Sequence, residues 1–191
     1  MPYFGLVVLA VVFGALIVRR PFLVKHLTLI VFATSAAVFG WLVFLSIRQH
    51  QIWEGYSLTR LFLPPYQDYG YFIFYIFFRF FLPYLISFAV AGLFYWLMVL
   101  ANKKSDCRFF EKEEPALAFL AVFLVGHPGW IVYFVCIILI YFIWHLVGKL
   151  RGEKNIRLPL YYLWLAMAVF VILIMMSGLW RMTPWWGLLE I

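Results

Sequence analysis

The chain has 191 residues, of which 67% are hydrophobic and 12% are charged, and its mean hydropathy is +1.00. A soluble domain carries about 45–50% apolar and about 25% charged residues, and a chain of this size cannot hide so much apolar surface in one core. Aromatic residues make up 23% of the sequence, which excludes an intrinsically disordered chain. The composition therefore predicts an all-α, polytopic integral membrane protein.

Apolar runs close to the length that crosses a bilayer as a helix predict about six transmembrane helices in a single membrane domain, 1–191. In chain order, the expected spans are 2–18, 27–47, 80–100, 115–125, 130–147 and 158–179. The fourth run is short, so it either borrows length from the residues before it or lies where the bilayer is thinner. The sequence Gly126-His127-Pro128-Gly129 predicts a tight hairpin between the fourth and fifth spans.

The longest segment between spans, 48–79, mixes polar and aromatic residues. Its middle part, 53–63, can form an interfacial helix that lies flat on the membrane and ends at Pro64-Pro65. Arg79 and Pro83 divide the following apolar run into an aromatic stretch, 71–78, and the third span. We therefore expect a loop segment with one interfacial helix here.

The positive charges predict an orientation. The chain has 15 Lys and Arg residues against 8 Asp and Glu residues, and six spans place eleven of those cations in three loops on one side. The positive-inside rule then puts both termini outside, in what we expect to be a prokaryotic cytoplasmic (inner) membrane. Because the cations lie in short loops, the expected partner is the lipid bilayer and not a nucleic acid. Tryptophans are expected to form a belt at each interface, with Trp53 in the outer belt and Trp96, Trp144 and Trp164 in the inner belt.

The main candidates for chemistry are Glu113 and Glu114, in a run of acids that opens the fourth span before Pro115. A carboxylate half-buried at the membrane edge can have a raised pKa and act as an acid or a base. Alternatively, Pro suits the first helical turn, and an acid beside it complements the positive end of the helix dipole. The structural interpretation is the favoured one.

A metal site is the less favoured interpretation of three other residues. His50, Glu54 and His127 are all expected outside, and two imidazoles with a carboxylate could bind zinc, although their spacing does not fix them together. The sequence contains no P-loop, Gly-x-Ser-x-Gly, His-Glu-x-x-His or Gly-rich dinucleotide turn. No cofactor is therefore expected.

One part of the sequence resembles the membrane core of the type IV prepilin peptidases. Residues 109–147 read FFEKEEPALAFLAVFLVGHPGWIVYFVCIILIYFIWHLV; in that family, a Gly-x-Gly-Asp motif ends an inner loop and opens a helix of small and apolar residues, followed by a break and another helix. The basic loop and Arg157-Leu158-Pro159-Leu160 resemble the family's entry into its last span. Residues 15–21 lie where the family's first catalytic Asp closes the first helix. The resemblance implies a six-helix domain with its motifs at the inner face.

Neither catalytic aspartate of that family is present. Val18 or Arg19 stands in place of the first, and Glu113 and Glu114 are the acids nearest to the second. Aspartic peptidases need two acids that share one proton. The resemblance therefore implies a pseudoenzyme, a non-catalytic scaffold or assembly factor that works with other membrane proteins of a pilus or secretion apparatus. The alternative is a divergent membrane peptidase or another inner-face enzyme that uses Glu113 or Glu114, and a small transporter comes third.

Overall fold

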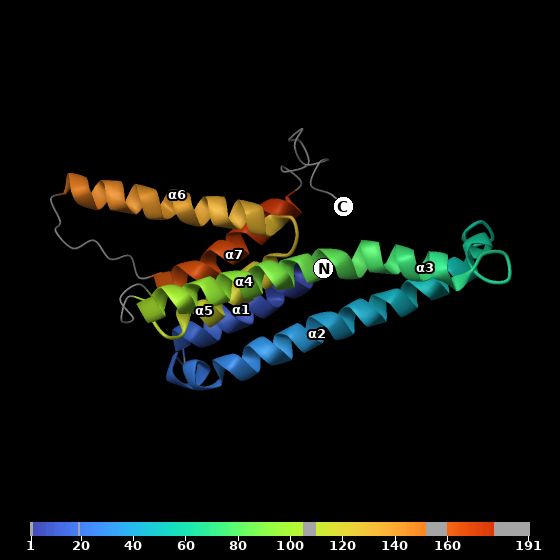
Figure 1. Cartoon of the computed structure of the whole chain (residues 1–191), viewed down its shortest axis with the longest axis horizontal. Helices are drawn as coiled ribbons and strands as arrows, with labels where there is room; N and C mark the ends of the chain where they lie inside the picture. The colour runs from blue at the N-terminus through green and yellow to red at the C-terminus, as the bar shows by residue number, and fades with distance from the viewer. Residues whose placement is uncertain (1, 19, 105–109, 152–159, 178–191) are drawn as a thin grey trace.

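The computed structural model describes residues 2–18, 20–104, 110–151 and 160–177 (Figure 1). All the regular elements among these residues are helical, which confirms the all-α prediction for this part of the chain. A helix lies over each of the six stretches expected to span the membrane, except that residues 158–159 and 178–179 of the last stretch lie outside the described residues. In order, the elements are α1 (Pro2–Val18), α2 (Arg20–Gly55), the 3-10 helix η1 (Thr59–Phe62), α3 (Tyr69–Ile76), the π-helical turn η2 (Phe77–Phe81), α4 (Leu82–Lys104), α5 (Glu114–Val125), α6 (Gly129–Leu150) and α7 (Leu160–Met176).

Within the described residues, three helical stretches are long and apolar enough to cross a membrane: Lys25–Gly55, Tyr69–Lys104 and Gly129–Leu150. The helices α1, α5 and α7 are shorter, with 17, 12 and 17 residues. At about 1.5 Å per residue, the length of α5 is only about 18 Å. The lengths of the helices therefore differ by more than twofold, and the short ones lie together.

The short helix α5 is the centre of the bundle. It contacts α1, α2, α4, α6 and α7, and all of its residues except Ala116 are buried. A helix that is apolar on every side is stable only when other helices surround it. The apolar run 115–125 therefore forms a central helix whose two ends are held by its neighbours.

Aromatic rings join α2, α4 and α5 near the end of α5. Phe123 of α5 is completely buried, and its ring lies 6.3 Å from Phe39 of α2, 5.6 Å from Phe88 of α4 and 6.1 Å from Phe119. The Tyr84 ring meets Phe123 edge-on at 6.3 Å. Edge-to-face and tilted pairs of this kind add to the energy of burial. This group, called here the Phe123 cluster, fixes the level at which α2 passes the end of α5.

Two glycines allow the close packing at this end of the bundle. A Cβ on Gly5 of α1 would lie 2.9 Å from the backbone oxygen of Leu124, so only glycine lets α1 approach α5 here. Gly126, with φ of +78°, ends α5 in the left-handed region that favours glycine. Since α6 begins at Gly129, the predicted hairpin at 126–129 is confirmed.

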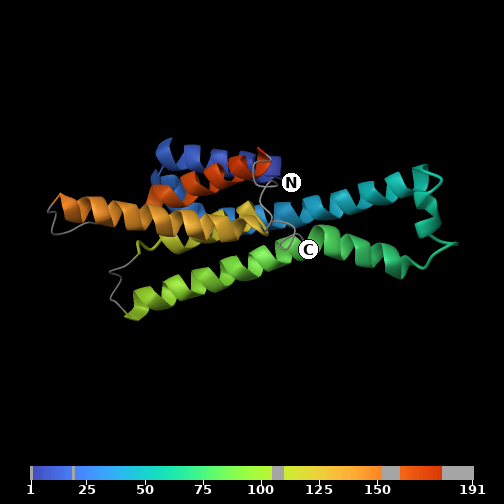
Figure 2. The same ribbon diagram turned by 90° about the horizontal axis from the view of Figure 1, so that it is seen from above.

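Beyond the bundle, α2 and α3 continue as a two-helix arm (Figure 2). The 36 residues of α2 extend about 54 Å, well past the level of Phe39, where α5 ends. At the tip of the arm, η1 reverses the chain into α3. We use the name outer arm for residues 43–81, because they lie outside the bundle that surrounds α5 (Figure 2).

The structure does not form a separate helix over 53–63, and the expectation that this segment lies flat on the membrane stays a prediction. α2 remains helical through Gly55, and within that range only Thr59–Phe62 forms a further, single 3-10 turn. The reason is that the Trp53 side chain is buried in a group of aromatic rings, called here the Trp53 cluster. The distances from the Trp53 ring centroid are 5.8 Å to Phe62, 6.3 Å to Tyr71, 5.3 Å to Phe72 and 4.8 Å to Tyr75. Packing of these rings around the buried Trp53 holds the end of α2 against α3, so α2 continues to Gly55.

The expected division at Arg79 and Pro83 has a structural counterpart. The helix from Tyr69 to Lys104 is continuous, but residues Phe77–Phe81 form a π-helical turn in which the Leu82 N–H bonds to the Phe77 oxygen. Proline has no N–H, so Pro83 cannot bond to the Arg79 oxygen as a regular α-helix requires. The π-helical turn lies where that bond is missing.

Candidate functional site

The entry to α5 is held by Asn102, the last buried residue of α4. The Asn102 side-chain amide donates to the Phe110 backbone oxygen at 3.0 Å, and its carbonyl oxygen accepts from the Phe110 N–H at 3.0 Å. Such a pair of bonds satisfies two backbone groups of a non-helical segment at once. Asn102 therefore fixes the position of the acidic run, Glu111 to Glu114, beside the C-terminal end of α4.

Glu114 is the buried member of that acidic run. Its residue is 4% exposed, and its Oε2 atom has no hydrogen-bond partner among the described residues. The pKa of the Glu114 carboxyl is raised from 4.5 to about 7. Burial is the largest cause, the nearby charges of Glu111 and Glu113 also raise the pKa, and a hydrogen bond from the Glu111 backbone lowers it. A carboxyl group in this state exchanges protons near neutral pH.

The same residues also start the helix. The Glu114 N–H donates to the Glu111 oxygen at 3.2 Å, and the Glu113 oxygen accepts from Ala116 and Leu117, each at 3.2 Å. Pro115 occupies the first turn, where a missing N–H costs nothing. The N-cap residue, Glu113, makes no side-chain hydrogen bond to the helix start. Glu113 and Glu114 therefore lie at the helix start, as the structural interpretation expects. This role does not explain why the Glu114 side chain is buried with its Oε2 atom unpaired among the described residues.

The chemistry open to this site is that of a single proton-exchanging acid. Glu114 can accept a hydrogen bond at Oε2, and when protonated it can donate one. The charges that act on it, those of Glu111 and Glu113, come from its own segment. At the end of α1, the described residues Ile17 and Val18 are apolar and exposed. The described end of α1 therefore offers no second acid that could share a proton with Glu114.

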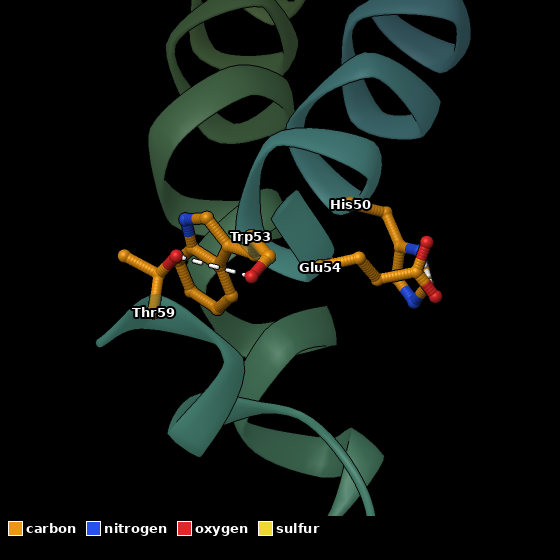
Figure 3. A network of polar contacts seen from close by, with 4 residues as sticks. All are labelled: His50, Trp53, Glu54 and Thr59. Atoms are coloured by element: carbon orange, nitrogen blue, oxygen red, sulfur yellow. Dashed lines mark hydrogen bonds and ion pairs between the residues drawn. The ribbon is translucent and has the colours of Figure 1, made fainter. Parts of the chain in front are cut away.

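The proposed metal ligands are not brought together. His50 Nδ1 and Glu54 Oε1 lie 3.6 Å apart, one helical turn from each other on α2 (Figure 3). His127 lies in the turn between α5 and α6, where its Nδ1 accepts a hydrogen bond from Trp130 Nε1 at 3.2 Å. In the described part of the chain, no group of three His, Cys, Asp or Glu side chains could hold a metal ion. The pair His50 and Glu54 remains as a polar feature of the outer arm.

Sequence reasoning missed Asn102 and assigned Trp164 to the wrong environment. Trp164 was expected in an interfacial belt, but it is buried, with its ring 5.8 Å from Phe94 and its backbone oxygen bonded to the Tyr133 hydroxyl at 3.0 Å. Trp96 and Trp144, expected in the same belt, are exposed. Nothing in the spacing distinguishes the buried tryptophan from the exposed ones, because all three lie in apolar runs.

No known family model, curated protein or solved structure matches this chain. The resemblance to type IV prepilin peptidases therefore stays a prediction, and function must be argued from the chain itself.

Proposed function

We propose that this chain is a six-span protein of a prokaryotic cytoplasmic membrane, with both termini outside, and that it acts as a non-catalytic scaffold or assembly factor. The process would be of the pilus or secretion type, as the resemblance to prepilin peptidases implies. Its inner face would carry the start of α5, and its outer face would carry the arm. Other membrane proteins of such an apparatus would be its partners.

One observation carries the non-catalytic part of this proposal. The acids near Glu114 belong to its own segment, while the end of α1, where the resembled family has its first catalytic aspartate, has only apolar described residues. A peptidase dyad requires two acids that share one proton. A single acid at the start of a buried helix supports a role in structure.

A second candidate rests on the state of Glu114. A buried carboxyl with a pKa near 7 and an unused oxygen matches the requirements for a general acid or base at physiological pH. Glu111, whose charge acts on it, would be the partner acid. This would be an inner-face enzyme, the alternative that the sequence leaves open.

The two candidates predict different results for the variant Glu113→Gln with Glu114→Gln. Gln keeps hydrogen-bonding capacity but cannot exchange a proton. If the protein is a scaffold, the double variant restores piliation or secretion to a deletion strain within about twofold of wild type. Glu113→Gln removes a helix-start charge that contributes only about 0.3–1 kcal/mol, and Gln at position 114 resembles the protonated form of the buried carboxyl. If Glu114 is a general acid or base, activity falls by about 10²–10⁴-fold.

Expression is measured in parallel by immunoblot, and Glu113→Gln alone serves as the matched control because Glu113 is the less buried acid. Loss of complementation at normal expression in the double variant, with the single variant active, would overturn the scaffold proposal and favour the enzyme.

A further inference from the structure

A groove runs along the outer arm between α2 and α3 with η2. Its volume is about 610 Å³. Five of the nine side chains that line it are apolar and four are polar. The apolar side chains are Val43, Ile47, Phe72, Ile76 and Phe81, and the polar ones are Ser46, His50, Gln51 and Glu54. Ser46 lies among the apolar side chains and Phe72 packs against His50, but the two ends of the groove differ. Val43 and Phe81 line one end and Gln51 and Glu54 the other, so the groove fits a molecule with one apolar and one polar end.

The lengths of the helices place this groove at a membrane boundary. Lys25 and Arg48 are exposed and lie about 34 Å apart along α2, and Lys103 and Arg79 are separated by a similar length along the returning helix. The hydrocarbon core is about 30 Å thick, and helices commonly tilt by about 20°. Both cation pairs therefore fit the two edges of the bilayer, with Arg48 and Arg79 at the same edge.

The groove crosses that edge. Val43 and Phe81 lie on its hydrocarbon side, whereas His50, Gln51 and Glu54 lie on its headgroup side. The rings of the Trp53 cluster are at the same level as the polar end, which is where aromatic side chains gather in membrane proteins. Val43 and Phe81 thus face acyl chains, whereas His50, Gln51 and Glu54 face headgroups together with Phe72 and Ile76, which lie on the headgroup side of Arg79.

The polar end has a defined arrangement. The His50 ring stacks on Tyr69, at 6.5 Å between centroids, and meets Phe72 edge-on at 5.1 Å. Its Nδ1 lies 3.6 Å from Glu54 Oε1, so Nε2 is on the other edge of the ring. Figure 3 shows His50 and Glu54 side by side. It also shows a separate hydrogen bond from Thr59 Oγ1 to the Trp53 oxygen, at 3.1 Å. The carboxylate is 59% exposed and can accept further hydrogen bonds.

We propose that this groove binds a phospholipid whose headgroup carries a primary ammonium, as in phosphatidylethanolamine. The ammonium donates hydrogen bonds to the Glu54 carboxylate, and the phosphate accepts from Gln51 and from His50. One acyl chain lies along Val43, Ile47 and Phe81. Arg48 and Arg79 at the same edge attract the phosphate of any phospholipid, so the Glu54 carboxylate provides the selectivity. A primary ammonium donates charge-assisted hydrogen bonds to that carboxylate, whereas a choline headgroup has no N–H to donate.

The test uses the full chain purified in detergent, with lipid binding measured by native mass spectrometry. The probes are phosphatidylethanolamine, phosphatidylcholine and phosphatidylglycerol with identical acyl chains. We expect wild type to bind phosphatidylethanolamine at least fivefold more tightly than the other two. Glu54→Gln abolishes that preference while leaving phosphatidylcholine binding unchanged. Because Glu54 is largely exposed, the substitution leaves the packing of the arm intact.

Asp68→Asn is the matched control, since it removes a carboxylate from the same arm outside the groove. It should keep the fivefold preference. Equal affinity for the three lipids in wild type, or an unchanged preference in Glu54→Gln, would overturn the proposal. A second copy of the chain that occupies the groove, detected as a dimer that excludes lipid, would overturn it as well.

Discussion

Replacing Phe123 with Ala is expected to lower the free energy of unfolding by about 3 kcal/mol. Phe123 is fully buried and touches rings from α2, α4 and its own helix. Truncating such a ring leaves a cavity that neighbouring helices fill only in part, and Phe→Ala changes in packed cores cost about 3–5 kcal/mol. Lipid supplies no hydrophobic gain between helices, so we expect the lower end of that range. Unfolding of the purified chain in a detergent titration measures the change.

Phe142→Ala is the control for this experiment. The same ring is removed from α6, but Phe142 is 63% exposed and packs against no central helix. Its substitution should change the free energy of unfolding by about 0.5 kcal/mol or less. Equal losses in the two variants would show that α5 is not the centre of the bundle.

Glu114→Gln is expected to stabilise the protein at high pH and to have little effect at low pH. The pKa of Glu114 is raised from 4.5 to about 7, so the folded state holds this proton more firmly than the unfolded state. Its stabilising contribution is complete below pH 4.5 and is lost as the pH rises through 7. Because Gln resembles the protonated carboxyl, the variant should exceed wild type by about 3 kcal/mol at pH 8 and by less than about 1 kcal/mol at pH 5.

Thermal unfolding in detergent at pH 5 and pH 8 measures this difference. Glu113→Gln is the matched control, because it removes a neighbouring charge without removing the buried carboxyl. Its effect should be small at both pH values. A gain for Glu114→Gln that is the same at pH 5 and pH 8 would be inconsistent with a buried, titrating Glu114.

The parts of the fold that the sequence predicts are those set by hydropathy and by glycine. The run 115–125 becomes α5, and Gly126 ends it because its φ of +78° suits glycine. The outer arm was not predicted, since the polar residues after Ile47 resemble a loop. Arg, Gln and His are compatible with a helix, and the burial of Trp53 against α3 keeps them helical. That contact joins residues of different helices, so no local pattern reveals it.

The candidate site was predicted in part for a similar reason. Glu113 and Glu114 stand out because they precede Pro115, a local pattern. Of these two glutamates only Glu114 is buried, because the helices around α5 enclose it. Those helices lie elsewhere in the sequence, so no local pattern predicts the burial. Asn102 was missed because its partners are backbone atoms of Phe110, and any residue could supply them. The groove at His50 and Glu54 likewise depends on α3, which returns from the tip of the arm.

The central claim is that the outer arm and the start of α5 lie on opposite sides of the membrane. Labelling of single cysteines tests it most directly, in a chain whose own Cys107 and Cys136 are replaced by Ser. Tyr66→Cys lies at the tip of the arm, and Lys112→Cys lies just before α5; both positions are exposed. A membrane-impermeant maleimide should label Tyr66→Cys in intact cells and Lys112→Cys only after permeabilisation. Labelling of both in intact cells, or of Lys112→Cys alone, would contradict the account.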